Sequence, residues 1–390
     1  MRLAITHATC WPEIRRGGER LLADTARFLA ARGHDVTVLS TTPAMPQGGQ
    51  ERREEVLYQF LRRRDPPALL ARTRQVTLQH LFAWDARVAL RQGGYDSVLC
   101  YGWQDALGAL AARRAGARFR LVVGLIGIPV RAYFRRTPID GLAFRRAVAG
   151  ADAVFALSRF AAGRLQAEYG RPAALLPAPV DTAHFAAQAK PAPDGITRIL
   201  FVGDADEPRK GALLLARAYA AARDGFGAAA RLGYSGRMSG ATRTAILDAL
   251  PEALRAEAEF HGVGAIEDLP RLAAAATVVA SPAVWEALGM VLIEALAAGT
   301  PVVGCAHAGT LDIIDDPRIG ALFEPGPFRH VATNAAGLAE ALRRAVALAA
   351  LPQTEALCRA RAAAFSWDAL APRYESLLRP EGAPMDAALR

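Results

Sequence analysis

The strongest signal in the chain is at residues 281–303, which read SPAVWEALGMVLIEALAAGTPVV. This stretch follows an apolar strand and reads as a loop, a helix and the start of a further strand. Gly289 allows a tight turn into the helix, so backbone N–H groups of residues 289–291 can face an anion, which the helix dipole also attracts. Glu286 lies in the loop before this turn, and Glu294 lies about one turn into the helix. The stretch predicts an anion-binding helix start flanked by two carboxylates.

Short apolar runs alternate with helical patterns along the whole chain, which is typical of α/β proteins with parallel sheets. The pattern restarts after residues 186–196, a polar stretch with two prolines that is the best candidate for a domain boundary. Two doubly wound domains are the simplest interpretation, with the ligand beyond the carboxyl ends of the strands, in the cleft between them. The predicted strands are Leu3–Thr6, Val36–Leu39, Ser97–Cys100, Leu121–Leu125, Ala153–Leu157, Ala174–Leu176, Arg198–Val202, Ala230–Tyr234, Glu259–His261, Thr277–Ala280 and Pro301–Gly304. The predicted helices run from Gly17 to about Arg32, over Ala212–Arg223, near Arg243–Leu250 and over Val291–Ala298.

The composition is that of a globular protein. The 390 residues are 52% hydrophobic and 22% charged, which excludes a disordered or collagen-like chain. The four cysteines are scattered without metal-ligand spacing, which fits a reducing cytosol and predicts no metal. The chain start lacks a signal-peptide pattern, and no run of about 18 apolar residues occurs. A cytoplasmic location is expected, with peripheral attachment to the inner face of a membrane left open.

The stretch at 281–303 resembles the E-x7-E region of glycosyltransferase family 4, retaining enzymes of the GT-B fold that use nucleotide sugars. Nearly the whole chain takes part in the resemblance, and the further segments that carry it are GGE at 17–19, RGHDV at 32–36, PAPVD at 177–181, FVG at 201–203, RKG at 209–211 and FSW at 365–367. The resemblance implies two Rossmann-like domains facing across a cleft: an acceptor-side domain at 1–185 and a donor-binding domain at 186–365. It also implies that a C-terminal helix at 366–390 packs back on the first domain.

The same resemblance implies a role for each site residue. Glu286 would contact the transferred sugar near its reacting centre, and Lys210 would complete the catalytic pair by stabilising the leaving diphosphate. Donor binding is implied for Glu294 on the ribose, for Arg209 and the backbone of Leu288, Gly289, Met290 and Val291 on the diphosphate, and for Gly17 and Gly18 from the other domain. Cations can stabilise the diphosphate without metal, so no cofactor is expected. Lys210 is one of only two lysines, which favours a compact point charge at this position.

Two departures from the family pattern leave an alternative open. Asp204 stands where many relatives have an arginine, and residues 123–129 contain no histidine where many relatives have one near the sugar and acceptor. Either the glycines of that segment leave room for a bulky acceptor or another residue takes the role. The alternative is a catalytically inactive subunit of a glycosyltransferase complex that only binds the nucleotide sugar.

The positive charge lies in the first half of the chain. The net charge is +9, made up of +12 in residues 1–185 and −3 in residues 186–390. Within residues 52–146, 18 arginines stand against seven acidic residues and are interleaved with apolar and aromatic ones. This pattern favours a lipid-linked or acidic acceptor at an anionic membrane surface, although a solvated arginine-rich face would look the same. Nucleic acid is not predicted, because the acidic second half argues against it. The expected partners are a nucleotide sugar and a glycan, glycolipid or small-molecule acceptor.

Overall fold

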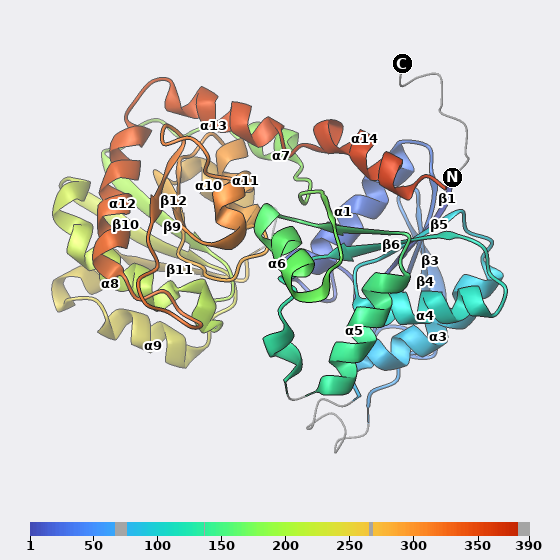
Figure 1. Cartoon of the computed structure of the whole chain (residues 1–390). Helices are drawn as coiled ribbons and strands as arrows, with labels where there is room; N and C mark the ends of the chain where they lie inside the picture. The colour runs from blue at the N-terminus through green and yellow to red at the C-terminus, as the bar shows by residue number, and fades with distance from the viewer. Residues whose placement is uncertain (67–75, 136, 265–267, 381–390) are drawn as a thin grey trace. The chain divides into compact units, whose positions relative to one another are not determined.

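The computed structural model describes residues 1–66, 76–135, 137–264 and 268–380 (Figure 1). The chain forms two compact units, the first built from Met1–Pro177 together with the segment that begins at Leu370, and the second from Ala178–Ala369. The sequence places the first boundary after residue 185. In the structure α7 (Thr182–Ala186) packs against α10 and α11 through Phe185, which is buried, and so it counts with the second unit.

The first unit contains an eight-stranded sheet in the order β3-β4-β2-β1-β5-β6-β7-β8. All neighbouring strands are parallel except β3 and β4, which pair antiparallel. The predicted α/β class is confirmed, and β3 adds an antiparallel strand at the sheet edge, where its residues GQERR carry no apolar signal. The strands are β1 (Arg2–Thr6), β2 (Asp35–Ser40), β3 (Gly49–Arg53), β4 (Val56–Phe60), β5 (Ser97–Cys100), β6 (Arg120–Leu125), β7 (Ala153–Ala156) and β8 (Ala174–Leu175).

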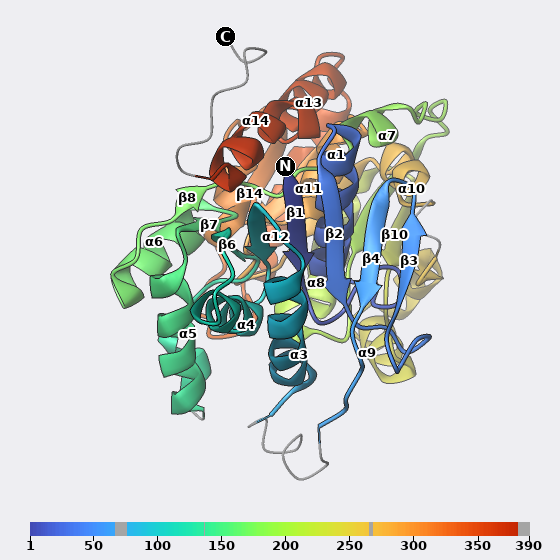
Figure 2. The ribbon, with the colours of Figure 1, turned by 90° about the vertical axis from the view of Figure 1, so that its right-hand side faces the viewer.

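Helices cover this sheet on both faces. The helices α3, α4 and α5 pack side by side as one layer, and Figure 1 shows α14 on the other side of the sheet. In Figure 2 the same unit is turned so that β1, β2, β4 and β3 follow one another across the view. The helices of this unit are α1 (Gly17–Ala31), α3 (Leu78–Gln92), α4 (Trp103–Arg114), η1 (Arg131–Phe134), α5 (Pro138–Gly150), α6 (Arg159–Tyr169) and most of α14 (Trp367–Leu378).

The helix α14 packs against the first unit through polar and aromatic contacts. Glu375 accepts hydrogen bonds from Arg32 Nε at 2.5 Å and Arg32 Nη2 at 3.2 Å. Ser97 donates to the backbone oxygen of Leu378, and the Tyr374 ring lies 5.7 Å from that of Phe155. These contacts lie beyond Leu370, where the chain re-enters the first unit.

The second unit contains a six-stranded sheet, parallel throughout, in the order β11-β10-β9-β12-β13-β14. Its strands are β9 (Ile196–Val202), β10 (Ala229–Ser235), β11 (Ala258–Gly262), β12 (Val278–Ser281), β13 (Val302–Cys305) and β14 (Gly320–Phe323). Its helices are α7, η2 (Pro208–Lys210), α8 (Ala212–Ala222), η3 (Arg223–Phe226), α9 (Gly240–Asp248), η4 (Glu252–Glu257), α10 (Leu269–Ala275), α11 (Met290–Ala297), η6 (Ala308–Asp312), α12 (Ala335–Ala349) and α13 (Thr354–Ala363). The helix α9 begins ahead of the predicted Arg243 because Ser239 caps it, accepting from the Thr242 N–H at 3.2 Å.

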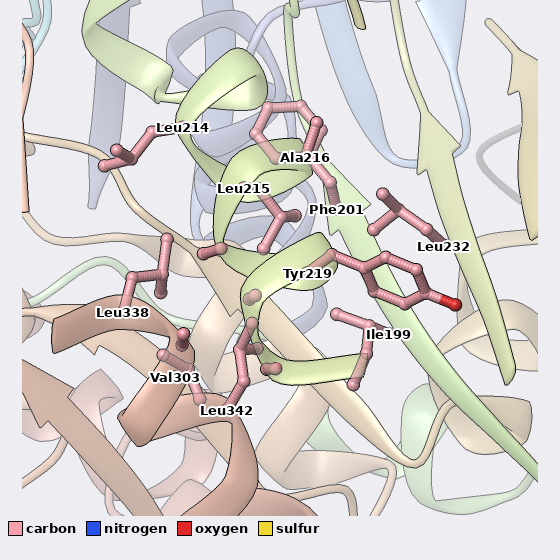
Figure 3. Packing of buried hydrophobic residues seen from close by; sticks show 14 of the residues in the cluster. Ile199, Phe201, Leu214, Leu215, Ala216, Tyr219, Leu232, Val303, Leu338 and Leu342 are labelled. Carbon is pink, nitrogen blue, oxygen red and sulfur yellow. The ribbon is translucent and has the colours of Figure 1, made fainter. Parts of the chain in front are cut away.

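A core of apolar side chains joins α8 and α12 to the sheet of the second unit. Figure 3 shows Leu215 and Tyr219 of α8 beside Leu342 of α12 and Ile199 of β9, all of them buried. The Tyr219 hydroxyl reaches the edge of this core and donates to Glu257 Oε2 at 2.6 Å. This packing fixes the ends of β9 and β12, which are the strands that lead into the candidate site.

Asp105, in the first turn of α4, is a buried carboxyl group that the sequence did not single out. Its side chain is 1% exposed. Oδ2 accepts a long hydrogen bond from Thr6 Oγ1 at 3.5 Å, and Oδ1 has no hydrogen-bond partner among the described residues. Burial raises the pKa of Asp105 from 3.8 to about 6, although His7 and Thr6 act in the opposite direction. An acid that is harder to ionise in the folded than in the unfolded state stabilises the fold only while it is protonated.

Asp105→Asn should therefore remove a pH-dependent loss of stability. The contribution of Asp105 is complete below pH 3.8 and is lost as the pH rises through about 6. Between pH 5 and pH 8 the wild type should lose about 1 kcal/mol relative to the variant. Urea unfolding at the two pH values measures this difference. The exposed carboxylate of Asp65 provides the control, because Asp65→Asn should follow the wild type at both; an equal gap for Asp105→Asn at both pH values would contradict the prediction.

Candidate active site

Two backbone segments of the second unit meet where β9 and β12 end. The turn η2 ends at Gly211, which has a φ of 75° and starts α8. A Cβ at Gly211 would lie 2.8 Å from Pro282, so only glycine fits against the loop after β12. The N–H of Val284 donates to the backbone oxygen of Arg209 at 3.0 Å. The turn and the loop are thus joined backbone to backbone, and each presents its charged side chains beside those of the other.

Lys210, Arg209 and Glu286 form one cluster across this junction. Lys210 Nζ donates to Glu286 Oε2 at 2.6 Å, and Arg209 Nη1 donates to the same oxygen at 3.1 Å. The three side chains are partly accessible, with exposed fractions of 23%, 31% and 19% in that order. Residues that lie 76 positions apart in the sequence are therefore brought into direct contact.

A second carboxylate, which the sequence analysis missed, completes the cluster. Glu207 accepts from Arg209 Nε at 2.6 Å and from Arg209 Nη2 at 3.2 Å. Two cations and two carboxylates thus balance one another. Burial alone would raise the pKa of Glu286, but the charges of Lys210 and Arg209 outweigh it and hold the pKa below its ordinary value. Glu286 is therefore an ionised hydrogen-bond acceptor at neutral pH.

The start of α11 lies next to Glu286. Gly289 precedes the helix with a φ of 100°, and its Cα is close to the Glu286 side chain, since a Cβ there would lie 3.6 Å from Glu286 Cγ. Leu288 is buried, while Met290 and Val291 are partly exposed. The first N–H groups of a helix have no partner within the helix. They provide donors for an anion beside the charged cluster.

Gly309 packs against this loop, and no sequence pattern pointed to it. Its N–H donates to the backbone oxygen of Glu286 at 3.0 Å. A Cβ at Gly309 would lie 2.4 Å from the backbone oxygen of Ala287 and 2.5 Å from Leu288 Cα. Only a glycine at 309 lets this backbone approach the loop that carries Glu286.

The remaining predicted residues lie in two helices, Glu294 in α11 and Gly17 and Gly18 at the start of α1. Glu294 is in α11 and is 4% exposed, so its carboxyl group belongs to the interior of the second unit. Gly17 and Gly18 begin α1 in the first unit, where a Cβ at Gly18 would lie 2.8 Å from Ile126 Cδ1. Their contact with a diphosphate remains a prediction.

The two departures from the family pattern have local explanations. Asp204 accepts from Arg237 Nε at 3.0 Å, with Arg237 Nη2 at 2.8 Å, so the anion expected there is paired with a cation that the sequence analysis missed. Gly124 makes room for packing, because a Cβ there would lie 2.5 Å from Phe155. Gly127, in contrast, has nothing within 4 Å of a Cβ and borders open space.

Most described arginines at the start of the segment 52–146 are paired. Arg53 contacts Glu13 at 3.0 Å and Glu51 at 3.3 Å, Arg63 lies 3.7 Å from Asp65, and Arg64 pairs with Asp85. Arg72, Arg74 and Arg136 lie outside the described residues. The arginines of residues 52–146, which the sequence analysis groups into one basic region, are therefore not equally available to an anionic partner.

Known proteins with the same fold and sequence pattern show the class of protein to which this chain belongs. The sucrose-phosphate synthase of Thermosynechococcus elongatus has the same fold, with a TM-score of 0.78 at 21% identity over 97% of this chain and 98% of that one. The two parallel-sheet units are those of the GT-B glycosyltransferases. A family model described as Glycosyltransferase Family 4 matches residues 15–184, and one described as Glycosyl transferases group 1 matches residues 196–348. Together they cover most of the chain, which belongs to glycosyltransferase family 4.

Curated relatives match shorter stretches. The D-inositol 3-phosphate glycosyltransferase of Mycobacterium leprae is 40% identical over 97 residues, which are 24% of this chain and 21% of that protein. The GDP-mannose-dependent alpha-(1-6)-phosphatidylinositol monomannoside mannosyltransferase of Mycolicibacterium smegmatis is 32% identical over 273 residues, 62% of this chain and 66% of that protein. The chain thus spans about a fifth of the first relative and just under two thirds of the second.

Proposed function

We propose that the chain transfers a sugar from a nucleotide diphosphate sugar to an acceptor hydroxyl, with retention of the anomeric configuration. The observation that carries the proposal is the contact of Lys210 and Arg209 with Glu286, directly ahead of the start of α11. Two cations, an ionised acceptor and free helix N–H groups within one junction suit a ligand that joins a diphosphate to a sugar. Family membership and fold also support glycosyl transfer from a nucleotide sugar.

Donor binding exchanges one set of ionic partners for another. The diphosphate takes over Lys210 and Arg209, and its remaining oxygens accept from the N–H groups of residues 289–291. Glu286 then gives up its contacts with the two cations and accepts hydrogen bonds from the sugar. The exchange thus replaces carboxylate by phosphate at the two cations, while Arg209 keeps its hydrogen bonds to Glu207 and the Glu286 carboxylate is hydrogen-bonded by sugar hydroxyls.

The chemical step follows from this arrangement. The bond between the anomeric carbon and the diphosphate oxygen breaks, and its electron pair stays with the diphosphate. The acceptor oxygen bonds to the anomeric carbon on the same face, and its proton passes to a diphosphate oxygen. Negative charge grows on the diphosphate as the bond breaks, and Lys210 with Arg209 stabilises it there. In the same proposal Glu294 holds the ribose, and Gly17 and Gly18 contact the diphosphate from the first unit.

The acceptor is a glycan or glycolipid in this proposal. One relative is named for a phosphatidylinositol monomannoside and another for an inositol phosphate, both of which carry phosphate. The arginine excess of the first half suits such anionic acceptors. The four cysteines are free and buried, in keeping with the cytosolic location proposed here. In the part of the chain that the structure describes, no helix has both the length and the apolarity needed to cross a bilayer.

A donor screen followed by a product assay tests the proposal. Thermal shifts of the purified chain with UDP-, GDP-, TDP- and ADP-sugars identify the donor, with GDP-mannose included because of the mannosyltransferase relative. Release of the nucleoside diphosphate is then followed with phosphoinositide glycolipids and free inositol phosphates as acceptors, and NMR of the product gives the anomeric configuration. We expect one donor to raise the unfolding temperature and to be consumed with retention. Donor binding without product across the acceptor panel would instead support the inactive subunit, and an inverted product would refute retention.

A further inference from the structure

Two adjoining hollows on the first unit are lined by residues of α5, η1 and the end of α6; Figure 1 shows where α5 and α6 lie. Both hollows are lined by Leu142, Arg145 and Tyr169. One continues to Arg146 and Arg171 and the other to Arg131 and Phe134. Since the two share a wall, they form one groove, called here the α5–α6 groove. It lies in the same unit as the arginine excess, but Tyr169 and Arg171 fall outside the segment that the sequence singled out.

The cations of this groove are short of carboxylate partners. Arg145 and Arg146 are exposed on α5, and within the described ranges neither has an ion pair. Arg171 Nη2 donates to the backbone oxygen of Ala151 at 2.8 Å, while Arg171 Nε is buried without a partner among the described residues. The one acidic side chain at this end of α6, Glu168, already accepts from the Arg164 guanidinium and from the backbone N–H of Arg131. The α5–α6 groove therefore carries unbalanced positive charge, unlike the paired arginines near residues 53–64.

A buried hydroxyl points to an oxygen ligand in the same place. The Tyr169 hydroxyl is inaccessible to solvent and has no hydrogen-bond partner among the residues described. Its ring is held 4.8 Å from Phe144, and the Arg131 guanidinium lies 5.6 Å from its centre. A buried donor without an acceptor costs stability unless a ligand satisfies it. An anionic oxygen in the groove would do so.

Large apolar side chains stand exposed beside these cations. Ile139 is 82% exposed, Leu142 68% and Tyr133 61%. Single exposed apolar residues are common on protein surfaces, but Leu142 lines the groove together with Arg145, Ile139 lies one turn before it on α5, and Tyr133 lies in η1, which packs on α5. Exposed apolar and basic side chains on the same elements form the mixed surface that suits a membrane interface. A free phosphate or a nucleic acid backbone would use the arginines and leave Ile139 and Leu142 in water.

We propose that the α5–α6 groove binds the phosphate of an anionic phospholipid and attaches the first unit to a bilayer surface. The lipid phosphate accepts from Arg145, Arg146 and the Tyr169 hydroxyl, while Ile139, Leu142 and Tyr133 enter the interfacial layer. Arg171 adds charge at the far end of the groove. The proposal does not depend on sugar transfer, so it stands or fails separately from the proposed function.

Vesicle sedimentation with the full chain tests the site. The probes are vesicles of phosphatidylcholine alone and of phosphatidylcholine with phosphatidylglycerol. The wild type should bind the anionic vesicles at least about tenfold more tightly, and Arg145→Ala/Arg146→Ala should weaken that binding about thirtyfold, as expected for two charges near an anionic surface. Ile139→Ser/Leu142→Ser should weaken binding as well, because apolar insertion is lost. Tyr169→Phe, which removes only the hydroxyl, should weaken binding by a smaller factor.

A matched double variant separates this groove from general charge. Arg114→Ala/Arg118→Ala removes the same charge from exposed positions of the same arginine-rich segment and should bind like the wild type. Equal losses for the two double variants would overturn the proposal in favour of a diffuse basic face. So would equal binding to neutral vesicles, full displacement from anionic vesicles by inorganic phosphate, or tighter binding to duplex DNA than to the anionic vesicles. Circular dichroism of each variant confirms that folding is retained.

Discussion

Lys210→Ala is expected to lower the rate of sugar transfer by about 10²–10³-fold or more, the loss seen when a charge-stabilising donor is removed from a reaction centre. The ammonium group lies 2.6 Å from Glu286 in the structure and would face the diphosphate once the donor is bound. Its loss removes stabilisation where negative charge grows, and it also leaves Glu286 with Arg209 alone. Glu286→Gln keeps the shape of the side chain but removes its charge, and we expect a loss of similar size.

Release of nucleoside diphosphate under saturating donor measures this effect as a change in kcat. Lys210→Arg should recover only part of the rate, because the planar guanidinium does not reproduce a compact point charge. Arg318→Ala is the matched control: Arg318 is a cation of the same unit, 66% exposed, paired with Asp316 in its own turn. It should transfer sugar like the wild type. A Lys210→Ala chain that folds normally and turns over at the wild-type rate would remove Lys210 from the site.

Gly309→Ala is expected to cost about 10²-fold in transfer, because a displacement of about 1 Å at a reaction centre has an effect of that size. The new methyl group would lie 2.4 Å from the Ala287 oxygen and 2.5 Å from Leu288 Cα, and both of these atoms belong to the backbone. No side-chain rotation relieves such a contact. The loop from Glu286 to Leu288 must move, and with it the carboxylate that meets the two cations.

The control for this substitution is Gly240→Ala, at the start of α9. A Cβ there meets nothing within 4 Å, so the variant should keep both its activity and its unfolding temperature. For Gly309→Ala we expect a lower unfolding temperature together with the loss of transfer, read by thermal unfolding and by the same nucleotide-release assay. If Gly309→Ala transfers sugar as fast as Gly240→Ala, the backbone contact behind Glu286 does not position the site.

The sequence predicted the elements whose signal is local. The apolar runs that became β1, β9 and β12 are readable because buried parallel strands need continuous apolar residues. Gly289 and Glu286 stood out because a turn, a helix start and two spaced carboxylates fall within one short stretch. The strand β3 was missed because its residues, GQERR, lie at an exposed sheet edge and carry no apolar periodicity.

Contacts between residues far apart in the chain could not be predicted from the sequence. Lys210 and Glu286 were both singled out, but nothing in their spacing reveals that they share an ion pair, or that Glu207 takes two hydrogen bonds of Arg209. The pairing of Asp204 with Arg237 depends on how two strand ends come together. Position 309 needs glycine because it packs against the backbone of Ala287 and Leu288, more than twenty residues earlier in the chain. Local residue propensities do not reveal a contact over that separation.

Because α14 belongs to the first unit but lies near the end of the chain, the first unit is completed only late in synthesis. Ser97 donates to the backbone oxygen of Leu378, 281 residues further along, and Arg120 bonds Leu377 across 257 residues. A ribosome therefore releases the whole of the second unit before it supplies the helix that completes the first. Domains generally fold as units while they emerge, but here the first unit to emerge must wait with the part of its sheet that α14 covers still exposed. The nascent chain should depend on chaperones most strongly until α14 has left the exit tunnel, and a stop codon ahead of α14 should send the product to proteases even though every strand of both sheets is present.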